Sequence, residues 1–150
     1  SSMEPIDVAP EFSEFLKSLI DKDVEFLVIG GYAVAVHGYV RSTGDLDVWV
    51  NDSPANIQAV REALAMFGLT GALTQPDLLT PGKILRIGMP PLRIEVLTSI
   101  DGVTFSECIG RATSAQFGDV AVPVISRDDL LANKRASGRQ KDLVDVAELS

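Results

Sequence analysis

Two aspartates, separated by one residue, are the side chains in this sequence whose type and spacing most directly suggest chemistry. Asp45 and Asp47 lie in the alternating segment GDLDVWV, residues 44–50. Successive side chains of a strand point to opposite faces, so both carboxylates are expected on the same face. Two like charges this close resist ionising together unless a cation lies between them. The pair therefore predicts either a solvated strand face or a site for Mg²⁺, which prefers oxygen ligands.

A third acid lies on a second alternating segment, LRIEVL, residues 92–97. There Glu95 is expected on the face opposite the apolar residues. If the two strands are neighbours with their apolar faces in a common core, Asp45, Asp47 and Glu95 converge. Three carboxylates can hold two divalent ions, Mg²⁺ or Mn²⁺, about 3.5–4 Å apart, the spacing that stabilises the attacking and leaving oxygens of a phosphoryl transfer.

An apolar run that ends in two glycines precedes the aspartates. Residues 26–29 predict a buried strand, Gly30 and Gly31 a tight turn, and residues 32–37 a helix that Gly38 ends. Backbone N–H groups at the start of a helix can bind phosphate, and glycine has no Cβ to obstruct the approach. A glycine pair of this kind is either a phosphate-binding turn or only a turn.

Several arginines and one threonine could act together with the acids and the glycine pair. Arg41 could contact a bound phosphate or brace an aspartate with two hydrogen bonds, and Thr43 could orient Asp45. Arg86 and Arg93 could flank the site, although an ordinary salt bridge on the sheet surface is the simpler interpretation of each.

Charged residues also gather towards the end of the sequence. Lys134, on a helix that begins at Ser126, could extend to a bound phosphate, although a lysine on a helix is usually solvated or paired. The residues around Gly138 are expected to form a structural ion-paired cluster: Arg139, Lys141, Asp142 and Asp145.

The elements that position these residues follow from the spacing of apolar side chains and from capping residues. Residues 101–118 give a mixed pattern. The predicted fold class is α/β, a mixed sheet of about five strands with helices packed against it. Further helices are expected over residues 10–22, 54–67 and from Ser126, and further strands over residues 83–89 and 121–125.

The composition is ordinary for a single domain, expected here over residues 1–150. The sequence is 46% hydrophobic and 23% charged, with a net charge of −8. We expect a cytoplasmic protein with no membrane span, because no apolar run approaches the length of one. The acidic balance argues against broad electrostatic binding to nucleic acid. The single Cys108 has no partner for a disulfide or a zinc site, and we expect it to be buried.

Together these motifs resemble the minimal nucleotidyltransferase domain of the DNA polymerase β superfamily. The form RSTGDLD at residues 41–47 is similar to the branch that includes the AbiEii-type toxin nucleotidyltransferases. The resemblance covers most of the chain. It rests on Gly30-Gly31, residues 41–47 and residues 94–96, and it extends to residues 122–126, Lys134 and residues 138–142.

The resemblance implies which residues form the site. The catalytic and metal-binding residues would be Asp45, Asp47 and Glu95. The nucleotide-binding residues would be Gly30, Gly31, Arg41, Thr43 and Lys134. The sequence departs from the usual pattern at two positions. Tyr32 stands where many members have serine, and the third acid is glutamate where aspartate is usual.

We therefore expect a Mg²⁺-dependent nucleotidyltransferase that transfers a nucleoside monophosphate from an NTP to an acceptor hydroxyl and releases pyrophosphate. The acceptor could be RNA, a protein side chain or a small molecule such as an antibiotic. A homodimer or a partner protein could complete the site. The alternative, which the Tyr32 and Glu95 departures favour, is a catalytically silent module that binds nucleotide or protein, including a component of a toxin–antitoxin pair.

Overall fold

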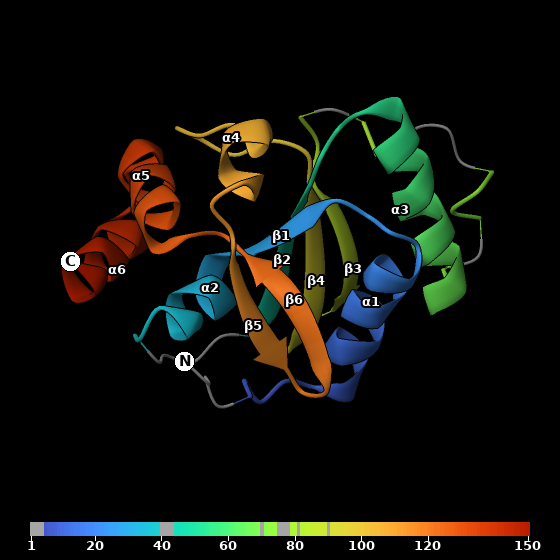
Figure 1. Ribbon diagram of the computed structural model, residues 1–150, viewed down its shortest axis with the longest axis horizontal. Coiled ribbons are helices and arrows are strands. Elements are labelled where there is room, and N and C mark those ends of the chain that lie inside the picture. The colour runs from blue at the N-terminus through green and yellow to red at the C-terminus, as the bar shows by residue number, and fades with distance from the viewer. Residues whose placement is uncertain (1–4, 40–43, 70, 75–78, 81, 90) are drawn as a thin grey trace.

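Six strands form one mixed sheet in the order β3-β4-β2-β1-β6-β5, with helices around it (Figure 1). The computed structural model describes residues 5–39, 44–69, 71–74, 79–80, 82–89 and 91–150, without the side chain of Lys141. The predicted α/β class is confirmed, with six strands in place of about five. The additional strand lies in the segment whose sequence pattern is mixed.

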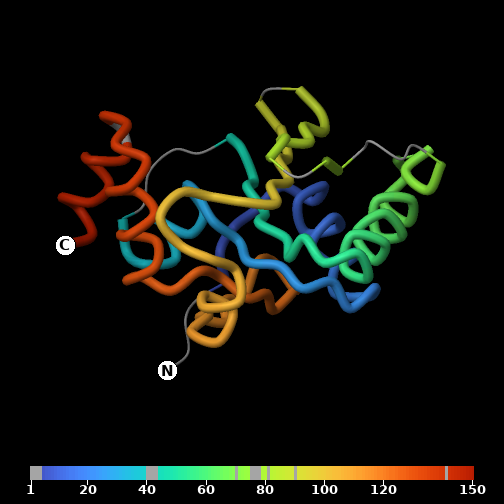
Figure 2. The backbone as a smooth tube through the Cα atoms, turned by 90° about the horizontal axis from the view of Figure 1, so that it is seen from above, coloured from blue at the N-terminus to red at the C-terminus, as the bar shows by residue number. Residues whose placement is uncertain are grey.

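The predicted helices and strands are all present. The helices are α1 (Pro10–Asp21), α2 (Gly30–Val36), α3 (Pro54–Phe67), α4 (Phe105–Ile109), α5 (Arg127–Ser137) and α6 (Gln140–Leu149). The strands are β1 (Phe26–Ile29), β2 (Asp45–Val50), β3 (Leu85–Met89), β4 (Leu92–Leu97), β5 (Thr113–Phe117) and β6 (Val120–Val124). Helices α5 and α6 lie at one end of the molecule and α3 at the other, as both views show (Figures 1 and 2).

Capping residues explain where α3 begins and ends. The Ser53 hydroxyl accepts a hydrogen bond from the backbone N–H of Asn56, at 3.3 Å, and Pro54 takes the first helical position. Gly68 ends the helix with a φ of +111°, a conformation that glycine adopts without steric cost.

Helix α5 is capped at Ser126 and anchored through Asp129. The Ser126 hydroxyl accepts a hydrogen bond from the backbone N–H of Asp129, at 3.1 Å. The Asp129 carboxylate also reaches outside the helix. It accepts two hydrogen bonds from Arg111, each of 3.0 Å, so the helix is tied to the segment between α4 and β5.

The hydrophobic core lies between the sheet and helices α1 and α3. These helices pack against each other, with the rings of Phe15 and Phe67 5.3 Å apart. The core face of the central strands contributes Leu46, Val48 and Val96, each with no exposed surface. Full burial of such a side chain contributes roughly 1.5–3 kcal/mol. The alternation therefore fixes which face of β2 and β4 enters the core, because a slip of one residue would bury the acids.

Tyr32 is a core residue of α2. Its ring lies 5.9 Å from that of Phe12 and 5.8 Å from that of Phe117, and 8% of its surface is exposed. Burial raises the pKa of its hydroxyl. The departure from serine at this position therefore has a packing explanation.

Cys108 tests a further sequence expectation, and His37 links two elements. Cys108 is fully buried, as expected. The His37 ring lies 2.7 Å from the carbonyl oxygen of Ile125, through Nε2, and so links the end of α2 to the end of β6. Among the described residues, no helix has the length and apolar character that crossing a membrane requires.

Candidate active site

Strands β2 and β4 bring the predicted acids to one face of the sheet. The two strands are parallel neighbours, and their register pairs Asp47 with Glu95 and Asp45 with Arg93. The residues between them, Leu46 and its neighbours in the core, point the other way. The expectation that these strands are adjacent is confirmed, and the acids line one cavity.

The Arg93 guanidinium lies between two of the acids. Its Nη2 donates to Asp45 Oδ2 at 2.9 Å and lies 3.3 Å from Glu95 Oε1. The hydrogen bond to Asp45 raises the pKa of Arg93. Arg86 on β3 also contacts Glu95, at 3.4 Å, but its side chain is 55% exposed. The salt bridges that the sequence suggested are therefore present, and they involve the candidate metal ligands themselves.

The junction of β1 and α2 is shaped around Asp47. Strand β1 ends at Ile29 and α2 begins at the next residue, Gly30, whose φ is +69°. A Cβ at Gly30 would overlap Asp47 Oδ2 and lie 3.1 Å from Asp47 Cγ. The first glycine of the pair therefore leaves the space that the Asp47 carboxylate occupies, and it lines the cavity beside that carboxylate. Gly31 is buried within α2.

The cavity has a volume of about 530 Å³ and lies between the sheet and the C-terminal helices. The acids of β2 and β4 form one wall. Asn133, Lys134 and Ser137 of α5, with Arg139 and Asp142, form the opposite wall. Asn133 donates to the carbonyl oxygen of Asp101, at 2.9 Å, which ties the segment after β4 to α5. The acids of β2 and β4 and the charged residues around Gly138 thus face the same cavity.

Lys134 is paired with two carboxylates in this wall. Its ammonium lies 3.0 Å from Asp142 and 2.9 Å from Asp145, and its side chain is 5% exposed. Arg139 adds a contact of 2.7 Å to Asp142, and the Ser137 hydroxyl donates to the same carboxylate. Arg139, Asp142 and Asp145 form the structural cluster expected around Gly138, with Lys134 at its centre, whereas the side chain of Lys141 lies outside the described part of the chain.

The Asp142 carboxyl stays ionised although it is buried. Burial alone would raise its pKa, but hydrogen bonds from Ser137, Arg139 and Lys134 outweigh burial and lower the pKa to about 2. The buried carboxylates of this cluster, Asp142 and Asp145, are therefore charged, and each lies within ion-pair distance of the Lys134 ammonium.

The comparison with protein families decides the assignment. The family model described as a nucleotidyl transferase of unknown function (DUF2204) matches residues 9–150. The chain belongs to this family. No curated protein is detectably similar to this chain in sequence.

Solved structures show the same fold. TM1012 from Thermotoga maritima, a candidate nucleotidyltransferase, matches with a TM-score of 0.61 at 12% identity, over 94% of this chain and 93% of its own. The lincosamide antibiotic adenylyltransferase LnuA, solved with lincomycin bound, matches with a TM-score of 0.59 at 13% identity. The match covers 95% of this chain and 96% of LnuA. An antigenic nucleotidyltransferase-like protein from Paracoccidioides brasiliensis matches with a TM-score of 0.54 at 14% identity. The match covers 93% of this chain and 74% of that protein.

The sheet wall of the cavity offers oxygen donors that suit a divalent cation. The carboxylates of Asp45, Asp47 and Glu95 lie there, and one cationic nitrogen already bridges Asp45 and Glu95. Within the described part of the chain, no three acidic, histidine or cysteine side chains are arranged to hold one metal ion. The donor chemistry fits Mg²⁺, whereas the present arrangement holds a guanidinium.

Sequence reasoning left some of this site unassigned. Arg41 and Thr43 lie outside the described residues. Arg93 and Arg139 line the cavity and contact its acids. From the sequence, Arg93 was expected either to flank the site or to form a surface salt bridge, and Arg139 to belong to a structural cluster. The period-2 spacing of Arg93 and Glu95 is the signal that places both on the acidic face.

Proposed function

We propose that this protein is a Mg²⁺-dependent nucleotidyltransferase, which transfers a nucleoside monophosphate from an NTP to an acceptor hydroxyl and releases pyrophosphate. The observation that supports the proposal most is the register of β2 and β4. It sets Asp47 beside Glu95 and puts Asp45 on the same face, at the edge of a cavity of about 530 Å³. A cavity of this volume is within the usual range for small-molecule sites.

Each acid has a role in the proposed reaction. Asp45 and Asp47 hold the metal, Mg²⁺ or Mn²⁺, and Glu95 completes the ligand set. When bound, the metal lowers the pKa of the acceptor hydroxyl and neutralises charge on the leaving pyrophosphate. Glu95 accepts the proton as the acceptor oxygen bonds to the α-phosphorus and the bond to pyrophosphate breaks.

Other residues of the cavity position the triphosphate. Gly30 lines the cavity beside Asp47 and offers its backbone N–H group, and the predicted contribution of Gly31 would come from the next N–H group of α2. Lys134 lines the same cavity, and Asp142 and Asp145 fix the position of its ammonium group. In the proposal its positive charge attracts the triphosphate from that fixed position. Arg41 and Thr43 stay predictions for phosphate contact.

The acceptor is not assigned by the geometry. LnuA is an adenylyltransferase for lincosamide antibiotics, and the two chains cover 95% and 96% of each other, which supports small-molecule hydroxyls among the acceptors to be tested. RNA and protein side chains stay candidates. The AbiEii-type branch, a toxin–antitoxin role, a homodimer or partner protein and a cytoplasmic location likewise stay predictions.

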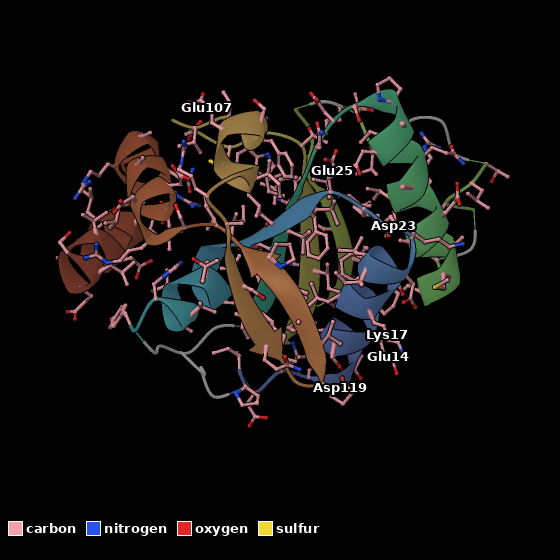
Figure 3. All side chains as sticks on the ribbon, in the orientation of Figure 1. Glu14, Lys17, Asp23, Glu25, Glu107 and Asp119 are labelled. Carbon is pink, nitrogen blue, oxygen red and sulfur yellow. The ribbon has the colours of Figure 1, made fainter. Side chains whose placement is uncertain are left out.

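The test is a transfer assay with each α-labelled NTP, Mg²⁺ or Mn²⁺, and total RNA, the protein itself and hydroxyl-bearing antibiotics as acceptors. The wild type is expected to release pyrophosphate and label one acceptor, and Asp47→Asn is expected to lose both activities while keeping its fold. Asp119→Asn serves as the control, because Asp119 is exposed at the turn between β5 and β6 (Figure 3). Unchanged turnover in Asp47→Asn contradicts the mechanism. Nucleotide binding without transfer to any acceptor supports the silent module.

A further inference from the structure

Arg93 holds the position that a divalent ion would need. On β4 it lies two residues before Glu95 and therefore on the same face, and its register partner on β2 is Asp45. One nitrogen, Nη2, contacts carboxylate oxygens of both acids, at 2.9 Å and 3.3 Å. They belong to two of the carboxylates that the proposed metal site uses. A guanidinium and a metal ion cannot both lie between them.

The guanidinium is only partly satisfied in this arrangement. Its Nε is buried and has no hydrogen-bond partner among the described residues. A buried donor without an acceptor is unfavourable, and a planar guanidinium forms its best contacts with carboxylate or phosphate through two parallel hydrogen bonds. Arg93 lines the cavity, so an oxyanion that enters the cavity could supply acceptors that the protein does not.

We propose that Arg93 is an internal counter-cation, which a metal–triphosphate complex displaces from Asp45 and Glu95 and which then binds the phosphate oxygens. The inference rests on the proposed function and adds a coupling between its two ligands. A metal ion that binds alone must break the contacts of Arg93 with Asp45 and Glu95, and it offers the guanidinium no new acceptors. Metal that arrives with a triphosphate brings the new acceptors along, so each ligand raises the affinity for the other.

The size of the coupling follows from the exposure of the pair. The side chains of Arg93 and Asp45 are 31% and 36% exposed, so water screens their attraction. We therefore expect removal of the Arg93 charge to raise the affinity for metal alone by about 3- to 10-fold, not by orders of magnitude. By linkage, the gain in metal affinity that a nucleotide brings should fall by a similar factor.

Arg86 provides a matched control. It also contacts Glu95, but at 3.4 Å and with a side chain that is 55% exposed. Arg86→Gln changes the net charge of the cavity as Arg93→Gln does. General electrostatic attraction would raise the metal affinity equally in both variants, whereas displacement of a bridging guanidinium affects Arg93→Gln selectively.

The experiment measures the binding of Mn²⁺ by electron paramagnetic resonance of the free ion, alone and with each of the four NTPs. The proteins are the wild type, Arg93→Gln, Arg93→Met, Arg93→Lys and Arg86→Gln, each checked for cooperative unfolding. We expect the two neutral Arg93 variants to bind Mn²⁺ alone about 3- to 10-fold tighter than the wild type. Arg93→Lys and Arg86→Gln should stay within about twofold of it.

Each contrary result has a separate meaning. If the wild type binds Mn²⁺ and the neutral Arg93 variants bind it no tighter, the counter-cation role is wrong while the proposed metal site stands. An equal gain in Arg86→Gln also overturns that role, because the effect is then general electrostatics. If none of the proteins binds Mn²⁺ with or without nucleotide, the proposed function itself fails, and the inference fails with it.

Discussion

The carboxylate of Asp47 occupies the space that a side chain on Gly30 would fill. A Cβ at Gly30 would overlap Asp47 Oδ2 and come within 3.2 Å of Asp47 Cβ, and the φ of Gly30 is +69°. This relationship joins the end of β1 to the middle of β2 across the antiparallel pair, in which Ile29 lies opposite Asp47. The glycine at this position is therefore required by the acid as well as by the turn.

Gly30→Ala is expected to move the Asp47 carboxylate and abolish Mg²⁺-dependent NTP binding, measured by calorimetry. The positive φ adds a loss of roughly 1–2 kcal/mol in the free energy of unfolding. Gly118→Ala is the control, because its φ of +61° is similar but its Cβ would make only ordinary contacts at 3.7 and 3.8 Å. The control should lose stability and keep binding. Full binding by Gly30→Ala would show that Asp47 does not need this space.

The Asp142 carboxyl should make the stability of the protein depend on acid pH. Its pKa falls from 3.8 unfolded to about 2 folded, so its contribution is present above pH 3.8 and disappears as the pH falls through 2. The full contribution is about 2 kcal/mol. Urea unfolding between pH 5 and pH 2 should show a shallower loss of stability in Asp142→Asn than in the wild type. An identical pH dependence in both would contradict the assigned pKa.

Replacing Lys134 should destabilise the protein strongly. Lys134→Met leaves Asp142 and Asp145 buried without their shared ammonium, and removal of one member of a buried ion pair costs about 3–5 kcal/mol. Lys17→Met is the control, because Lys17 is exposed on α1 (Figure 3). Urea unfolding at pH 7 measures both. If Lys134→Met were as stable as Lys17→Met, the pairing would contribute nothing and Lys134 would serve the ligand alone.

The Cys108 thiol should be inert in the folded protein. Burial, followed by the nearby Asp129 carboxylate, raises its pKa to about 11, so almost no thiolate exists at pH 8. A thiol-specific chromogenic reagent should label one cysteine per chain only in denaturant. Rapid labelling of the native protein at pH 8 would show that the thiol is accessible and that its pKa is not raised.

The sequence was sufficient for the acids on the sheet because strand alternation alone places them. Asp45, Asp47 and Glu95 share a face once β2 and β4 are neighbours, an adjacency that was assumed from the sequence and that the structure shows. The family resemblance suggested the reaction, a metal-dependent nucleotidyl transfer. Strand β5 was not predicted, because its sequence TSAQF has little apolar alternation and it lies at the edge of the sheet.

The exact partners within the ion pairs could not be predicted, because they depend on register and on how helices fold back. Arg93 contacts Asp45 only because the parallel register pairs these two residues, and sequence alone does not fix register across a crossover. Lys134 meets Asp142 and Asp145 because the chain turns at Gly138, with a φ of +67°, and α6 packs against α5. The sequence indicated the turn but not the partners that it brings together.

The most direct test of the proposed function is a calorimetric titration of the four NTPs, with and without Mg²⁺. The proteins are the wild type, Asp45→Asn/Asp47→Asn and the control Asp21→Asn/Asp119→Asn, whose exposed aspartates give the same change in net charge. We expect Mg²⁺-dependent binding of at least one NTP by the wild type and the control, and none by the Asp45/Asp47 variant. Binding that is unchanged in that variant, or independent of Mg²⁺, would contradict a metal–nucleotide site at these aspartates.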